Sequence, residues 1–282
     1  MRLRVLLGVA AVIGCGIGAV PAASGDGGPG PGVRQGWDGV AAKTMRYVPV
    51  TTAGGTTLLA IERRGGRVVN YLNLKGQWGV PAVAYDGLTG GLARDGKRLV
   101  LAEVRTRPDL RKRSSFLLVN VKQLRVIRKI QLKGDQSFDA LSPDAHFLYL
   151  VEFVSAQDLS RYRVRAFDIR ANKLLPKPVV DKREWEETMQ GSPVSRVESP
   201  DATWVYTLYA GGKHPFVHAL DTRHVQAVCV DLPRAWNQLD VGGMRLRWGA
   251  DGRILVRHVT GGKTFATIDA KSLRVVSLVR IP

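Results

Sequence analysis

Two histidines four positions apart, His214 and His218, are the first residues that could do chemistry, and they precede Asp221 and His224. On a helix, a spacing of four would point both imidazoles at one zinc ion. The residues around them have the pattern of a β-strand, in which positions four apart are separated by about 13 Å. We therefore expect no shared metal, and the sequence assigns no metal ligand.

Acidic and aromatic residues gather in the least repetitive segment of the chain, residues 181–197. Its centre contains Glu184, Trp185, Glu186 and Glu187. A comparable segment at residues 236–243 begins with Trp236. Loops of this kind often carry binding or catalytic residues, with an ordinary surface loop as the alternative. These five residues are candidate ligand or partner contacts.

No nucleophile paired with a base can be recognised in this chain. The sequence has no Gly-x-Ser-x-Gly turn that would expose a nucleophilic serine, and no glycine-rich phosphate loop before a helix. Serines beside the predicted turns, such as Ser142 and Ser199, are typical turn residues. We therefore assign no catalytic residue and no cofactor, and favour a non-enzymatic protein.

Basic residues form the third group of interest. The chain contains 42 Lys and Arg but only 24 Asp and Glu, which gives a formal net charge of +18. One cluster contains Arg105, Arg107, Arg111, Lys112 and Arg113. Comparable places in later repeats contain Arg161, Arg163, Arg165, Arg245 and Arg247. Outside a cell, such a surface would attract cell-wall polymers, acidic polysaccharides or lipid headgroups, and nucleic acid is not expected. The alternative is a solvated charged face.

A repeat of about 50 residues must position these groups. Its first anchor is an aspartate after a loop, found as Asp95, Asp144, Asp201 and Asp251, at spacings of 49, 57 and 50 residues. Its second anchor follows an apolar run, as Asn120, Asp168, Asp221 and Asp269, at spacings of 48, 53 and 48. These side chains can accept a backbone hydrogen bond and close a turn, so we interpret them as turn residues.

This period, built from turns and short apolar runs, is typical of a radial β-repeat. The third unit, for example, predicts strands at residues 138–141, 147–153, 164–169 and 174–180. Residues 58–62 and 68–74 predict a further hairpin, and residues 46–50 could add a strand. The expected fold is an all-β propeller of four-stranded antiparallel blades, with about five blades: four full repeats plus an N-terminal half blade.

The N-terminus predicts export. Residues 1–23 have a basic start, an apolar run and small residues before a cleavage site, which is the pattern of a signal peptide. Alternatively, Val12-Ile13-Gly14-Cys15 matches a lipoprotein box, with a lipid anchor on Cys15 and a place on the outer face of the membrane. Residues 24–45 are interpreted as a flexible Gly/Pro-rich linker, and residues 46–282 as the propeller domain.

Cys229 would be the one cysteine of that domain, in a predicted strand. We interpret it as an inert, buried thiol. A single cysteine in the mature chain allows no intramolecular disulfide.

The repeat units resemble those of secreted bacterial β-propellers of the YVTN and tryptophan–aspartate-like type. The resemblance rests on units such as Ser199-Pro200-Asp201-Ala202-Thr203-Trp204-Val205-Tyr206 and covers about residues 55–282. It implies the fold. Relatives with this fold include sugar-lactone hydrolases, surface-binding proteins and scaffolds, but this chain has fewer units than the seven-bladed lactonase-like members, and none of their catalytic residues can be matched here.

The function expected from the sequence is that of an exported, non-enzymatic propeller that binds a protein partner or an anionic surface polymer. One alternative is a lactonase-like hydrolase with its site on the face where ligands commonly enter propellers, near residues 184–187 and 236–240. Another is a structural scaffold for a second exported protein.

Overall fold

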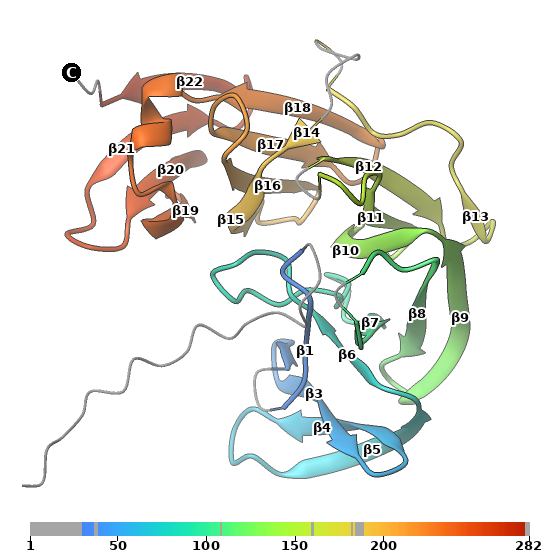
Figure 1. Ribbon diagram of the computed structural model, residues 1–282. Helices are drawn as coiled ribbons and strands as arrows, with labels where there is room; N and C mark the ends of the chain where they lie inside the picture. Colours follow the sequence, from blue (N-terminus) through green and yellow to red (C-terminus); the bar gives the residue numbers. More distant parts are fainter. Residues whose placement is uncertain are drawn as a thin grey trace, which may run out of the picture.

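The computed structural model describes residues 30–36, 39–107, 109–158, 161–181, 183 and 189–279. These residues form five antiparallel sheets, each built from four strands that follow one another in the chain. Figure 1 shows the sheets arranged along an arc in chain order. This is a β-propeller, as the repeat predicts, and we name its sheets blades 1 to 5.

Blades 1 and 2 form the first part of the arc. Blade 1 contains β2 (Val40–Ala41), β3 (Met45–Thr52), β4 (Gly55–Glu62) and β5 (Val68–Lys75). Blade 2 contains β6 (Trp78–Pro81), β7 (Arg98–Glu103), β8 (Arg113–Asn120) and β9 (Arg125–Lys133), and β1 (Val33–Arg34) pairs with β6. The predicted half blade is therefore a complete blade. Its strand β2, together with β1, lies within residues 24–45, where the sequence predicts a linker.

Blades 3 to 5 follow. Blade 3 contains β10 (Asp135–Leu141), β11 (Phe147–Phe153), β12 (Arg161–Asp168) and β13 (Lys173–Leu174), with β14 (Met189–Gln190) also paired to β12. Blade 4 contains β15 (Ser192–Glu198), β16 (Trp204–Ala210), β17 (Phe216–Asp221) and β18 (Gln226–Asp231). Blade 5 contains β19 (Met244–Trp248), β20 (Arg253–His258), β21 (Thr264–Asp269) and β22 (Arg274–Leu278). Two short 3₁₀ helices, η1 (Arg234–Gln238) and η2 (Val241–Gly243), link blades 4 and 5.

The aspartates of the first anchor close turns, as predicted. Each accepts a hydrogen bond on its Oδ1 from the backbone N–H two residues later, at 2.9 Å for Asp95 and 3.0 Å for Asp144. The residue after each aspartate has a left-handed backbone, with φ of 69° at Gly96 and 54° at Ala145. Glycine adopts this conformation without a steric penalty, which explains the Asp-Gly sequence of two of the repeats.

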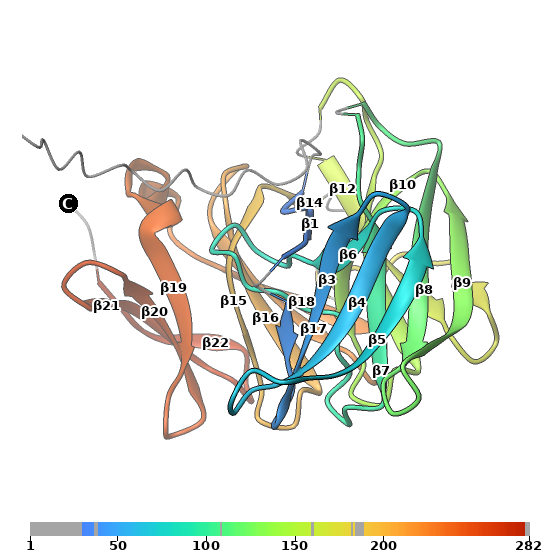
Figure 2. The ribbon, with the colours of Figure 1, turned by 90° about the horizontal axis from the view of Figure 1, so that it is seen from below.

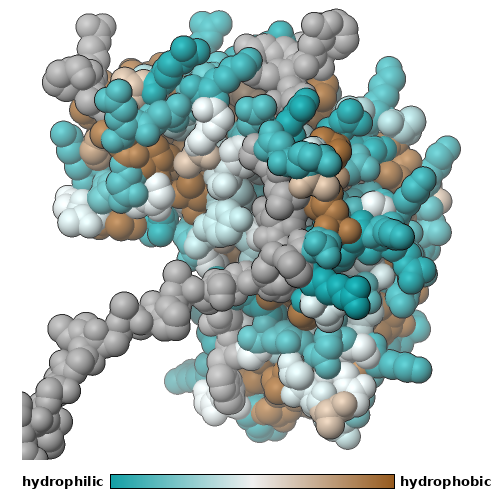
Figure 3. Space-filling view, in the orientation of Figure 1, coloured by the Kyte–Doolittle hydropathy of each residue, from teal (hydrophilic) through white to brown (hydrophobic). Residues whose placement is uncertain are grey.

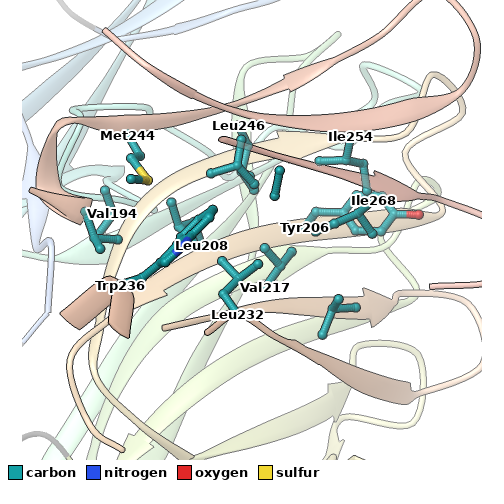
Figure 4. Packing of buried hydrophobic residues seen from close by; sticks show 14 of the residues in the cluster. Val194, Tyr206, Leu208, Val217, Leu232, Trp236, Met244, Leu246, Ile254 and Ile268 are labelled. Carbon is teal, nitrogen blue, oxygen red and sulfur yellow. The ribbon is translucent and has the colours of Figure 1, made fainter. Parts of the chain in front are cut away.

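Apolar side chains pack between successive blades. One cluster joins blades 1 and 2, a second joins blades 2 and 3, and two more lie between blades 3 and 4. The largest cluster lies between blades 4 and 5 and includes Leu208, Trp236, Leu246 and Ile254 (Figure 4). Neighbouring blades are therefore held together mainly by buried apolar surface.

Within the described residues, the arc is not closed. Blade 5 contacts blade 4 through β19 against β15 and β16, whereas within the described ranges no comparable contact joins blade 5 to blade 1. Figures 1 and 2 both show blade 5 beside blade 4 at one end of the arc. In the space-filling view, blade 5 and blade 1, at the two ends of the arc, are separated (Figure 3). No helix in the described part of the chain has the length and apolar character of a membrane span.

Candidate functional site

The predicted basic cluster is divided by burial into two parts. Asp135, at the start of β10, is 2% exposed and accepts hydrogen bonds from Arg105 Nη2 on both carboxylate oxygens, at 2.6 and 2.7 Å. Arg111 donates to the same carboxylate from its Nε and from its backbone N, both at 3.1 Å. Two arginines of the β7–β8 connection are thus fixed to one buried carboxylate of the next blade.

Arg105 and Arg111 are therefore anchors of this connection rather than members of an open basic patch. Arg105 is 6% exposed, and a buried charge needs a partner because its desolvation is costly. Arg107, Lys112 and Arg113 remain exposed to solvent. Arg113 lies directly opposite Lys133 on β9, which is also exposed. We call these four exposed cations the basic edge.

The acidic segment between blades 3 and 4 is described only at its ends. The candidates Glu184, Trp185, Glu186 and Glu187 lie outside the described residues. Asp181, just before them, accepts a hydrogen bond from Cys229 N at 2.6 Å and another from Arg183 N at 2.7 Å. Burial alone would raise the pKa of Asp181, but its hydrogen bonds with Arg183 and Cys229 lower it below the usual value. The start of the segment is thereby fixed to β18.

Trp236 is part of the core between blades 4 and 5. Its side chain lies on η1, is 1% exposed, and meets Phe265 edge to face with ring centroids 6.0 Å apart. The interpretation of Trp236 as a ligand contact is corrected by this burial. An aromatic residue in an irregular linker can fill the space between two sheets as well as it can face a ligand.

A small cavity of about 270 Å³ lies beside this core. His258 and Asp240 line it, with 3.4 Å between His258 Nε2 and Asp240 Oδ2. Asp240 Oδ1 also accepts a hydrogen bond from Gly243 N at 3.0 Å and caps η2. The cavity thus pairs an imidazole with a carboxylate that already has a structural role.

The other histidines separate as the strand pattern predicts. His218 is 2% exposed within β17, and burial lowers its pKa to about 4. His224 lies 2.8 Å from Asp221 Oδ2, and His214 lies 3.8 Å from Asp231 Oδ1. In the described part of the chain, no group of three histidine, cysteine or acidic residues could hold a metal ion.

A larger cavity, of about 820 Å³, lies at the centre of the arc. Its lining comes from the β2–β3 hairpin, the β6–β7 connection, β10 and β15. Arg196 and Asp139 line it as a buried ion pair, and Arg196 Nε also donates to Thr207 Oγ1 at 2.9 Å. Sequence reasoning missed this pair. The available signal was a charged residue inside each of two short apolar runs, at residues 138–141 and 194–197.

No protein family and no curated protein sequence matches the chain. Among solved structures, it is similar to a functionally unknown protein from Desulfotomaculum acetoxidans, with 15% identity, 88% of this chain and 71% of that chain covered, and a TM-score of 0.51. The Dos1 propeller gives 11% identity, 85% and 55% coverage, and a TM-score of 0.49. Hydrazine synthase from Kuenenia stuttgartiensis gives 19% identity, 67% and 48% coverage, and a TM-score of 0.41.

The chain thus spans about half the length of the hydrazine synthase and Dos1 propeller chains. The similarity to the Desulfotomaculum protein covers most of the present chain at low identity. At 15% identity, this similarity shows the fold alone.

Proposed function

We propose that this protein is an exported, non-enzymatic β-propeller of the YVTN-like type that binds an anionic surface polymer through its basic edge. The observation that carries the proposal is the arrangement of Arg107, Lys112, Arg113 and Lys133. All four are exposed, and three lie on or beside a connection that the buried Arg105 and the partly buried Arg111 fix to Asp135.

The opposed pair Arg113 and Lys133 supports an anionic ligand. Like charges directly opposite each other on neighbouring strands destabilise a sheet. A phosphate, sulfate or carboxylate placed between them would convert this repulsion into attraction. Because the connection is already anchored, binding would immobilise fewer backbone groups and would cost less conformational entropy.

Export is the second part of the proposal. The basic start, apolar run and small residues of residues 1–23 support it, with cleavage as a signal peptide or lipid attachment at Cys15 as the two routes. An exported basic protein meets anionic wall polymers and acidic glycans, and these are the ligands that the basic edge would bind.

The test compares two triple variants with equal changes in net charge. The first is Arg107→Gln/Lys112→Gln/Arg113→Gln, and the second is Arg64→Gln/Lys97→Gln/Lys271→Gln, whose three residues are exposed in separate turns. Binding to dextran sulfate is measured by fluorescence anisotropy at low and high salt. We expect the wild-type affinity to fall steeply with salt, because screened charges attract less.

The first variant should lose about tenfold or more in affinity, the change that a loss of 1.4 kcal/mol produces. The second variant should remain near wild type. Equal losses in both variants would mean that net charge alone drives binding. Salt-independent binding, or no binding to dextran sulfate, would refute the proposal.

A further inference from the structure

The two faces of blade 5 have opposite chemistry. Alternate residues of its strands point toward blade 4 and are buried: Met244, Leu246, Ile254, Val256, Ala266 and Ile268. Since successive side chains of a strand point to opposite faces, the residues between them face away from blade 4. On β19 and β20 these are Arg245, Arg247, Leu255 and Arg257.

This second face lies at the open end of the arc. In a closed propeller it would pack against another blade, but among the described residues blade 5 has extensive strand contacts with blade 4 alone (Figure 1). The interface between blades 4 and 5 is lined by apolar side chains. An arginine-bearing face is unsuited to such packing, because buried cations without partners are strongly unfavourable.

The register places these cations against each other. Arg245 lies directly opposite Arg257, and Arg247 lies opposite Leu255. Arg257 donates from Nε and Nη2 to Gly262 O at 2.9 and 2.6 Å, which satisfies donors without neutralising the charge. Arg247 is exposed, and the structure shows no hydrogen bond or ion pair of its side chain within the described ranges.

One carboxylate reduces the charge at the inner end of this face. Asp86, in the β6–β7 connection, lies 3.9 Å from Arg245 Nε. Arg245 Nη1 also donates to Gly242 O at 2.8 Å and to Met244 O at 2.7 Å. Arg247 and Arg257 therefore keep the uncompensated positive charge, with Leu255 as an apolar contact between them.

We propose that the open face of blade 5 binds an acidic peptide segment of a partner protein. Carboxylates of an extended peptide would pair with Arg247 and Arg257, and an apolar side chain between them would contact Leu255. Charge complementarity selects this occupant, since a second copy of this chain carries a formal net charge of +18 and would be repelled. The site is separate from the basic edge on blade 2.

The probe is a fluorescent peptide that alternates glutamate and leucine, with a lysine–leucine peptide of equal length as the control. The variant Arg247→Glu/Arg257→Glu reverses the two uncompensated charges, and Arg247→Gln is a milder change at one of these exposed residues. The matched control is Arg64→Glu, which reverses an exposed charge in the β4–β5 turn. Anisotropy gives the affinities, and thermal unfolding checks that each variant folds.

The double variant should bind the acidic peptide at least about tenfold more weakly, and Arg247→Gln severalfold more weakly. Arg64→Glu should remain near wild type, and dextran sulfate binding should change little in any of them. An unchanged peptide affinity in both Arg247 variants would overturn the proposal. So would loss of peptide binding in the Arg107→Gln/Lys112→Gln/Arg113→Gln variant, because the peptide would then be bound at the basic edge.

Discussion

Residues that are neighbours on β19 occupy opposite environments. Leu246 is 0% exposed in the interface between blades 4 and 5, whereas Arg247, the next residue, is exposed at the open end of the arc. The same alternation on β20 places Ile254 and Val256 inside and Arg257 outside. The residue types that alternate along a strand therefore indicate which of its two faces packs against a neighbouring blade.

The same comparison applies to the arginines bound to Asp135 and the exposed arginines of blade 5. Among substitutions, we expect the largest loss of stability where a buried charge loses its partner. The Asp135→Asn variant should destabilise the fold by about 3–5 kcal/mol, because Arg105 and Arg111 would face a buried amide in place of their carboxylate. Urea unfolding measures the change, and Asp158→Asn, in an exposed loop, is the control. A loss below about 1 kcal/mol would show that the pair contributes no more than a surface salt bridge.

Substitutions at the adjacent residues Leu246 and Arg247 of β19 test whether one face of blade 5 is packed and the other is open. Leu246→Ala should cost about 2–5 kcal/mol, because it leaves a cavity in the largest core cluster. Arg247→Ala should change stability by no more than about 0.5 kcal/mol, since it removes an exposed side chain. Chemical denaturation of both variants checks this. Similar losses at the two positions would mean that something covers the open face.

Blade 4 allows a pH test of the same principle. Its face toward blade 5 is apolar, whereas its face toward blade 3 includes Arg196, Thr207 and the buried His218. The pKa of His218 falls from 6.5 to about 4 because burial disfavours the charged imidazole. Between these values the unfolded chain binds one more proton than the folded chain, so stability declines as the pH is lowered.

The expected loss from His218 between pH 6.5 and pH 4 is on the order of 3 kcal/mol. The His218→Gln variant should lose that part of the pH dependence. The measurement is urea unfolding of both proteins at several pH values. If the free energy of unfolding changed with pH in the same way in both proteins, the pKa of His218 in the folded protein would not be lowered by burial.

The sequence was sufficient for the turns and most strands because these depend on local chemistry. Asp144 closes its turn through a backbone group two residues away, and the apolar runs of blade 3 correspond to β11 and β12. The outer strand of that blade is shorter than expected, since residues 174–180 were predicted and β13 ends at Leu174. Local patterns set where a strand occurs better than where it ends.

The environments of the candidate residues could not be predicted in the same way. Arg105 is bound by a carboxylate 30 residues later, on another blade, and Arg196 by one 57 residues earlier. For Arg105, nothing within its repeat unit indicates this partner, so an anchoring arginine and a ligand-binding arginine have the same appearance there. For Arg196, the surrounding apolar run indicates burial but does not identify Asp139 as the partner. Trp236 was misread for the same reason, because its neighbours come from two blades.

The open arc also affects how the molecule can fold. A closed ring needs its first and last sheets to meet before its final interface exists, and that step costs loop-closure entropy. Here each new blade can pack onto the one made before it, so native contacts can accumulate in the order of synthesis. Stability should then come mainly from nearest-neighbour interfaces, with smaller contributions from contacts between non-adjacent blades, such as Tyr85 N donating to Pro193 O. The blades at the two ends of the arc should open first, as they do in linear repeat proteins.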